Sequence, residues 1–399
     1  MQIPVGVKSP TGVSFQNQKK MRIYIYPSIC LKTLLFVVFS LIYLSSKSQS
    51  QADNIHIGFI YPISTHGTHA PADTNVFSFH VLAGVSAEEK SFTFSGLTNI
   101  VKNNVSGVQF AGFSNHIGGN SKGLLFAGFT NTYKAAEGIQ FAGFGNTAKR
   151  NIKGAQFAGF INTAGDVEGA EFGGFSNIAK NINGTQFAGF INVAKRIKGT
   201  QFAGFANIAK DVTGTQFAGF INVAKKVKGT QFAGFINIAD SSDNPIGILN
   251  FIKNGEKSIG VSIDENSTTL LSFRSGGKSL YGILGAGYNF ENEDEVYAFE
   301  AGLGAHFFPS KNFRINAELA QTTLESFNGG EYFKASARIL PAIRFASRIE
   351  IFGGPVLSYI NTNTAEGKSL HSKYIWNTTR NNNLQALYLG YTGGIQVLF

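Results

Sequence analysis

Hydrophobic and polar residues alternate along most of the chain after residue 50, and they do so in two different ways. From residue 92 to 240 one short alternating unit is repeated almost unchanged, whereas from 256 to 399 the alternating segments are longer and differ from one another. A period of two is the spacing of side chains on one face of a β-strand. The pattern therefore predicts an all-β protein with a repeat region followed by a second β region.

The repeat region is built on the motif GxQFAGFxN. The first Phe of each FAGF-type group follows the previous one by 15 or 16 residues, from Phe110 to Phe232, and FSGLTN at 94–99 is a degenerate copy upstream. Two glycines in each unit and frequent β-branched residues disfavour a helix. A short fixed period over about 150 residues predicts a repeat architecture in which each unit is a strand and a turn.

An asparagine lies five residues after the first Phe of every unit, and it bears on two possible architectures. In a β-solenoid each unit is one coil, and buried amides hydrogen-bond from coil to coil, which requires the same residue in each coil. In one large up-and-down barrel, neighbouring units run antiparallel and need no such identity. The identity favours the solenoid and yields these candidates for a structural ladder: Asn115, Asn131, Asn146, Asn162, Asn177, Asn192, Asn207, Asn222 and Asn237.

The charges of the repeat region favour the barrel instead. Residues 101–239 hold fourteen Lys and Arg against five acids, and many of the basic residues lie at expected turns, such as Lys195 and Lys225. Stacked coils would set like charges in columns, which is unfavourable unless salt or anions screen them. A barrel would divide them between two rims. Both architectures stay open at this point, with the solenoid as the leading prediction.

The C-terminal region predicts strands with one apolar and one charged face. In 332–345, for example, Phe333 and Ile339 alternate with Lys334 and Arg338. Apolar residues outside and polar residues inside are typical of a transmembrane β-barrel. Eight strands fit between 258 and 399, and 55–63 and 76–85 look like two more; such a barrel has a lumen filled by side chains. The charges expected to pair across it are Glu300, Arg314, Glu318, Lys334, Arg338, Arg348 and Glu350.

The connections of this predicted barrel are unequal at its two ends. A long polar loop at 361–384 lies at one end, and short turns at 275–278, 309–312 and 346–347 lie at the other. Outer-membrane barrels have longer extracellular loops and short periplasmic turns. The last strand ends at Phe399, and here the chain resembles Gram-negative outer-membrane proteins, whose final strand typically ends in Phe. That resemblance implies that Phe399 is an assembly signal read by the barrel-assembly machinery.

With its GxQFAGFxN repeats and barrel-like C-terminal region, the chain resembles a group of exported, Bacteroidetes-type outer-membrane surface proteins. The N-terminal segment agrees with export. Arg22 and Lys32 precede an apolar run at 34–44, which is typical of a cleaved secretory signal starting at Met21 or Met1. Without the six basic residues of 1–50, the net charge falls from +10 to 28 minus 24, or +4. The single Cys30 lies in this segment, so the mature chain has no disulfide.

The expected division is therefore 1–50 upstream segment and signal peptide, 51–91 strand pair, 92–240 repeats, 241–255 connector and 256–399 barrel. The chemistry-bearing candidates are weak: His66 and His69 could hold a metal, and His306, Ser336 and Glu300 could share a lumen as a hydrolytic triad. We predict no catalytic residue, metal, cofactor or nucleic-acid partner, since loops and lumen filling explain these residues.

The predicted function is a non-enzymatic outer-membrane surface protein with a scaffold or adhesion role. Its expected partners are outer-membrane lipid, including lipopolysaccharide phosphates at the basic turns, and the assembly machinery; the oligomeric state stays open. The alternative is a passive channel made of one barrel of about twenty strands. A lumen hydrolase acting on lipid is a minor alternative.

Overall fold

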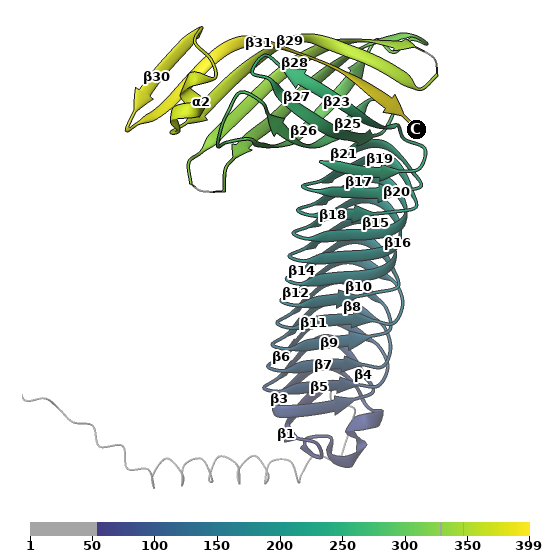
Figure 1. Cartoon of the computed structure of the whole chain (residues 1–399). Helices are drawn as coiled ribbons and strands as arrows, with labels where there is room; N and C mark the ends of the chain where they lie inside the picture. Colours follow the sequence, from purple (N-terminus) through teal and green to yellow (C-terminus); the bar gives the residue numbers. More distant parts are fainter. Residues whose placement is uncertain (1–53, 328, 346) are drawn as a thin grey trace, which may run out of the picture. The chain divides into compact units, whose positions relative to one another are not determined.

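A computed structural model describes residues 54–327, 329–345 and 347–399, and these residues are nearly all β. They form a parallel β-solenoid of about 12 turns and a closed antiparallel barrel of 8 strands (Figure 1), which confirms the predicted fold class. The proposed signal segment lies outside the described residues. Within the described residues, no helix is long and apolar enough to cross a membrane.

Each full solenoid coil contains a longer strand, a Gly-Phe turn and a shorter strand, so the structure divides the single strand expected for each unit. The longer strands are β1 (Ile55–Ile60), β3 (Thr74–Ser86), β4 (Glu88–Ser95), β6 (Val105–Ala111), β8 (Ser121–Ala127), β10 (Ala136–Ala142), β12 (Ile152–Ala158), β14 (Asp166–Gly173), β19 (Lys226–Ala233) and β21 (Ser241–Ile246). The shorter strands are β5 (Thr98–Val101), β7 (Ser114–Ile117), β9 (Thr130–Tyr133), β11 (Gly145–Ala148), β13 (Ile161–Thr163), β18 (Ile221–Val223), β20 (Ile236–Ala239) and β22 (Leu249–Ile252). β3 contains both strands of its coil, since its first part pairs with β4 and its last part with β5, and β2 (Ile63–Ser64) pairs antiparallel with β1. In β15 (Ser176–Ala188), β16 (Ile191–Ala203) and β17 (Ala206–Ala218), the short strand of one coil continues into the long strand of the next.

Successive coils pair in parallel and in register, so each residue of the motif lies beside its own copy. Asn177 pairs with Asn192, Gly184 with Gly199 and Phe187 with Phe202. The large up-and-down barrel is therefore wrong, and with it the twenty-stranded barrel on which the channel alternative depends. Antiparallel units would have placed each buried Asn against a different residue and left its amide without a matching partner.

Two segments outside the recognised repeats also belong to the solenoid. β1 and β3, expected as barrel strands, pair with each other in parallel and form the first coils. The short helix η1 (Gly67–Ala72) lies between them. At the other end, the expected connector 241–255 contains the further coil β21 and β22, in which Asn250 pairs with Asn237. Neither segment has the FAGF group, so the repeat motif does not identify them as coils.

The expected clash of like charges is absent from two columns of the solenoid, because the register alternates the sign of their charges. Along one column, Lys122 pairs with Glu137, Glu137 with Lys153, and Lys153 with Glu168. Along a second column, Arg196 pairs with Asp211, and Asp211 with Lys226. Opposite charges on neighbouring strands are favourable. The charge argument against the solenoid is therefore wrong for these columns.

Glycine is required at two positions of each coil that carries the full motif, from Gly107 to Gly234. Gly199 has a φ of 136°, a conformation that residues with a Cβ rarely adopt. A Cβ on Gly204 would lie 2.1 Å from the carbonyl oxygen of Gly189 in the preceding coil. The repeated glycines thus allow neighbouring coils to approach closely, and they leave a row of positions without side chains on the outer surface.

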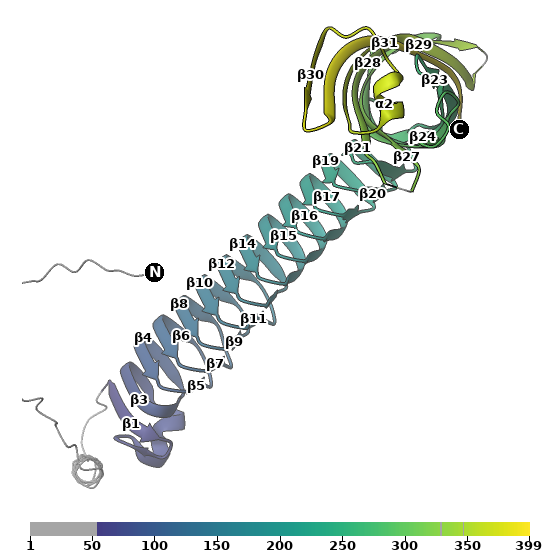
Figure 2. The same cartoon turned by 60° about the vertical axis from the view of Figure 1, so that its left-hand side comes forward.

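The barrel strands form a closed ring, seen nearly end-on in Figure 2. They are β23 (Lys257–Asp264), β24 (Thr268–Gly276), β25 (Leu280–Asn289), β26 (Tyr297–Phe307), β27 (Phe313–Glu325), β28 (Tyr332–Phe345), β29 (Ile349–Thr362) and β31 (Asn383–Leu398). The pairing of β23 with β31 closes the ring. The long connection between β29 and β31 contains α2 (Ala365–Ser369) and β30 (Trp376–Arg380), and β30 pairs with the first residues of β31.

Candidate functional site

The interior of the solenoid contains a continuous ladder of asparagine side chains. Each amide nitrogen donates to the side-chain oxygen of the next Asn at 2.8–3.0 Å, as in Asn192 to Asn207. Asn192 also donates to the Phe202 carbonyl oxygen at 2.6 Å. The column contains all nine predicted residues, from Asn115 to Asn237, together with Asn99 and Asn250. These buried amides hold coils together and are not accessible to a ligand.

A second ladder, of glutamine, is interrupted by a buried glutamate. Gln216 donates to Gln201 at 2.9 Å and Gln201 donates to Gln186 at 2.8 Å, and Gln186 donates to Glu171 at 2.7 Å. Burial raises the pKa of Glu171 to about 8, so its carboxyl is largely protonated at neutral pH. Within the described residues, Oε1 of Glu171 and Oε1 of Gln156 have no hydrogen-bond partner.

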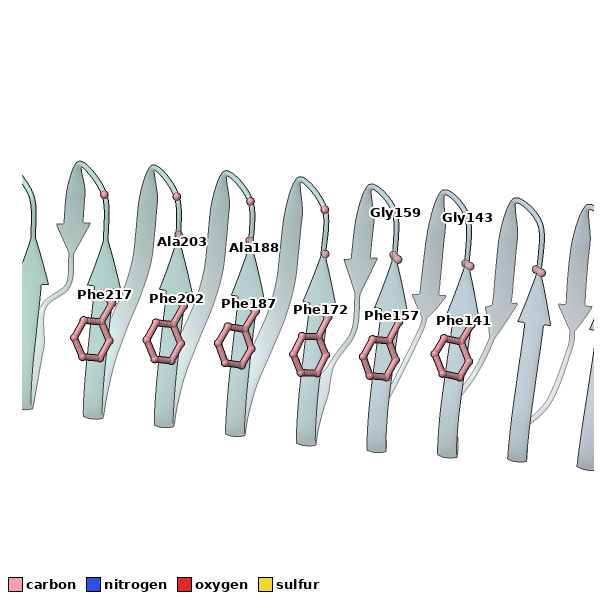
Figure 3. Close-up of a pocket in the computed structure, with 18 of the residues that line it drawn as sticks. Phe141, Gly143, Phe157, Gly159, Phe172, Phe187, Ala188, Phe202, Ala203 and Phe217 are labelled. Atoms are coloured by element: carbon pink, nitrogen blue, oxygen red, sulfur yellow. The ribbon is translucent and has the colours of Figure 1, made fainter.

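Two rows of phenylalanine rings run along the outside of the solenoid. Row I contains the first Phe of each FAGF-type group, and its rings stack at 4.7–5.1 Å from Phe110 to Phe217. Figure 3 shows the rings from Phe141 to Phe217. Row II contains the second Phe, stacked at 4.8–5.1 Å from Phe113 to Phe220. The rings remain partly exposed, 39% for Phe160. An exposed apolar surface of this extent is unusual on a soluble monomer.

Row I forms one side of a groove of about 820 Å³. The row I rings from Phe126 to Phe232 line it together with the Ala and Gly that follow each ring, as labelled in Figure 3 for Ala188, Ala203, Gly143 and Gly159. The groove exists because the Gly required for close approach of the coils leaves no side chain beside each ring. Sequence reasoning identified the repeated Phe and Gly but not this groove.

One corner of the solenoid has a basic ridge of four exposed lysines. Lys180, Lys195, Lys210 and Lys225 occupy equivalent positions in four successive coils, as the register of their neighbours requires. Here the expected like-charged column does form. Such a ridge attracts anions, with a strength that depends on ionic strength.

The barrel lumen is filled by buried ion pairs. Arg274 Nε lies 2.9 Å from Glu318, and Lys334 Nζ lies 2.8 Å from both Asp264 and Glu265. The other pairs join Arg338 to Glu300 and Arg314 to Glu350. Of the charges expected to point inward, Arg348 is instead exposed in the turn before β29. This filling leaves the channel alternative without support from the lumen.

The outer wall of the barrel is apolar and exposed. Leu319, Leu271 and Ile339 are 68%, 57% and 56% exposed. They lie on the faces opposite to the buried charges, because side chains alternate along each strand. Phe399 is also exposed, and its ring lies 6.5 Å from that of Phe273 on this wall.

The structure does not bring the three candidate triad residues together. His306 hydrogen-bonds Asn316 at 2.7 Å, Glu300 binds Arg338, and Ser336 lies 3.4 Å from Ser358. Glu300 and His306 are six residues apart on one strand, which separates them by roughly 20 Å. A hydroxyl, an imidazole and a carboxylate must be in direct hydrogen-bond contact to act as a triad.

The histidines near the N-terminus form a different cluster from the one considered. His66 stacks on His56 at 4.5 Å, and His80 Nε2 lies 3.2 Å from His56 Nδ1, whereas His69 is exposed. Burial lowers the pKa of His56 to about 3 and that of His80 to about 4. In the described part of the chain, no group of three or more His, Cys, Asp or Glu could hold a metal. The sequence could have indicated His56 and His80, because each lies between two apolar residues of an alternating segment and therefore on the opposite face of its strand.

No protein-family model, curated protein or solved structure matches this chain.

Proposed function

We infer that this protein is anchored in the outer membrane by its barrel and that the solenoid serves as a rigid scaffold for binding or adhesion. The observation that carries the proposal is the inverted polarity of the barrel. Charged side chains such as Glu318 and Arg274 are buried inside, whereas Leu319 and Ile339 are exposed outside. This distribution supports a hydrocarbon environment, because transferring one such apolar side chain out of water is favourable by about 1.5–3 kcal/mol.

The backbone of the barrel supports the same environment. The pairing of β23 with β31 leaves the ring of eight strands without an open edge. A closed ring satisfies its N–H and C=O groups internally, which is the requirement for crossing a bilayer with strands. In this proposal, Phe399 at the end of the last strand is the signal for the barrel-assembly machinery.

The scaffold role is supported by the construction of the solenoid. The coils from Asn99 to Asn237 are joined by backbone pairing and an Asn ladder, and from Phe110 to Phe220 also by stacked Phe rings, a combination that resists bending. The described solenoid residues offer stacked rings and a lysine ridge to the exterior and amide ladders to the interior. We propose that the basic ridge from Lys180 to Lys225 faces anionic groups such as lipopolysaccharide phosphates.

The proposal is tested by changing one outward residue of the barrel. In a bilayer, Leu319→Arg places a charge in the hydrocarbon and destabilises the barrel by about 2–4 kcal/mol. In water, the same change at an exposed site has an effect of about 0.5 kcal/mol or less. The matched control is Phe290→Arg, since Phe290 is equally exposed, at 68%, but lies in the connection after β25.

The measurements are cell fractionation and urea unfolding of the mature chain in liposomes. We expect wild type and Phe290→Arg in the outer-membrane fraction, with Leu319→Arg depleted there and less stable in liposomes. Recovery of the wild-type chain as a freely soluble periplasmic protein would contradict the proposal.

A further inference from the structure

Row I is apolar along the whole solenoid, beyond the part with the repeat motif. The coil register aligns the following residues in one outward column: Ile57, Phe79, Phe94, Phe110, Phe126, Phe141, Phe157, Phe172, Phe187, Phe202, Phe217, Phe232 and Ile246. At about 4.8 Å per coil, this column is roughly 58 Å long. The neighbouring column, formed by the residue two positions before each row I residue, is not apolar throughout. It changes from Ala170 to Thr185 and Thr200 in successive coils.

The barrel end of row I is continuous with the apolar barrel wall. Ile246, the last residue of the row, lines an apolar hollow of about 600 Å³. The hollow is completed by outward-facing barrel residues, among them Leu280, Leu303, Leu319 and Ile339. Phe232, the last ring of the groove along the coils, pairs with Ile246, so the groove and the hollow at the barrel wall are joined through this pair.

The chemistry of the lining restricts what the groove can hold. Its side chains are those of Phe and Ala, beside Gly backbone, and none carries a hydrogen-bonding group. A peptide or a sugar buried here would leave its own polar groups unpaired on the groove side, which is costly. A long chain without polar groups has no such cost, and the rings that line the groove follow one another from coil to coil between Phe126 and Phe232.

We propose that row I is a track that takes up acyl chains of membrane lipids from the barrel wall and holds them along the solenoid. This inference rests on the proposed function, because the lipid enters from the bilayer around the barrel. A second copy of the chain could also cover the Phe rings. The direct continuity with the wall at Ile246 favours lipid, since self-association would need neither an unbroken row nor a connection to the barrel.

The test uses the full mature chain in nanodiscs that contain a phosphatidylethanolamine with a photoreactive acyl chain. After irradiation, labelled residues are mapped by mass spectrometry. We expect labels on the barrel wall, around Leu303 and Leu319, and on row I residues such as Phe187 and Phe202. A photoreactive free fatty acid, added in a parallel sample, separates the two sources of acyl chain; labelling of row I by the free acid alone would overturn the proposal.

Three variants make the test specific. Phe187→Ser with Phe202→Ser should lower labelling of neighbouring row I residues at least fivefold, whereas the row II pair Phe190→Ser with Phe205→Ser should leave it within twofold. Ile246→Arg should lower labelling of the whole row while the barrel wall stays labelled. Hydrogen exchange of the ladder coils checks that each variant folds.

Other results would overturn the proposal in distinguishable ways. Equal labelling of rows I and II, insensitive to Ile246→Arg, would mean that the solenoid adsorbs to the bilayer surface. If row I of the wild-type chain stays unlabelled, and if the chain forms oligomers that dissociate in the row I variant, the row serves self-association. If the barrel wall itself is unlabelled, the proposed membrane anchor fails and not only the track.

Discussion

The solenoid and the barrel both bury polar side chains, but they satisfy them by opposite means. In the solenoid, the ladder asparagines from Asn99 to Asn250 lie beside identical residues, and an amide can both donate and accept. In the barrel, antiparallel strands place different residues opposite each other, such as Glu318 and Arg338. Charges of opposite sign can therefore pair in the lumen, as Arg274 and Glu318 do at 2.9 Å.

The comparison teaches that strand direction decides which polar groups a β interior tolerates. Parallel coils in register stack like with like, so only self-complementary groups can fill the column. An acid in such a column has no cation beside it: Glu171 accepts from Gln186, and Glu89, in the N-terminal coils, accepts from Asn75, Ser78 and Thr93. The buried acids Glu300, Glu318 and Glu350 of the barrel lumen, by contrast, are paired with arginines.

The largest expected effect is the removal of one barrel charge. Glu318→Ala leaves Arg274 without its nearest carboxylate, in a site where Arg274 is 5% exposed. Loss of one partner of a buried pair costs about 3–5 kcal/mol. Urea unfolding in liposomes should show this loss, while the inward control Ser336→Ala should change stability by less than about 1 kcal/mol. Equal effects of the two would contradict the ionic role.

The next effect concerns the acid in the amide ladder. The pKa of Glu171 is about 8 in the fold and 4.5 as the unperturbed value. The folded state thus binds the extra proton, and stability is fully present below about pH 4.5 and is lost as the pH rises towards 8. Glu171→Gln should remove this decline and stabilise the coil by on the order of 3 kcal/mol at pH 7.

Local hydrogen exchange of residues 160–200 in the full chain, measured at pH 5 and pH 8 after correction for the intrinsic exchange rate, checks the prediction. Glutamine at this position could also donate to Oε1 of Gln156, which has no partner among the described residues. Wild type and Glu171→Gln showing the same pH dependence would refute the burial argument.

A smaller effect is expected from breaking the asparagine ladder. Asn192→Ala removes donation to Asn207 and Phe202 and acceptance from Asn177. Leaving a buried amide unsatisfied costs about 1–3 kcal/mol. Hydrogen exchange should accelerate in the coils on both sides of residue 192, and less so in the control Val193→Ala, whose side chain points outward. Acceleration confined to residue 192 would mean that the ladder does not couple coils.

The smallest effect concerns surface charge, where the two kinds of column can be compared directly. Lys210 lies between Lys195 and Lys225, so Lys210→Glu should stabilise the local coils by a few tenths of a kcal/mol. Lys153 lies between Glu137 and Glu168, and Lys153→Glu should destabilise by a similar amount. Both differences should vanish at about 1 M salt, where the Debye length is about 3 Å. If hydrogen exchange of the local coils changed in the same direction in both variants, relative to wild type, the register argument would be contradicted.

Sequence reasoning succeeded where a local pattern was repeated and failed where register or spatial neighbours decided. The repeated Asn favoured the solenoid, because amides that hydrogen-bond from coil to coil require the same residue in each coil. The coils β1, β3, β21 and β22 were missed because they lack FAGF, although Asn250 continues the ladder. The expected charge repulsion was wrong for Lys122 to Glu168, because sign alternation becomes visible only once coils are aligned.

By itself, the sequence determined the β class, the period of the coils and the alternation of polar and apolar faces in the barrel. These are properties of residues close together in the chain. The tertiary structure alone decided which charges pair in the lumen and that row I meets the barrel wall at Ile246. Each of these joins residues distant in sequence, and their contact depends on strand register and packing, which no local pattern encodes.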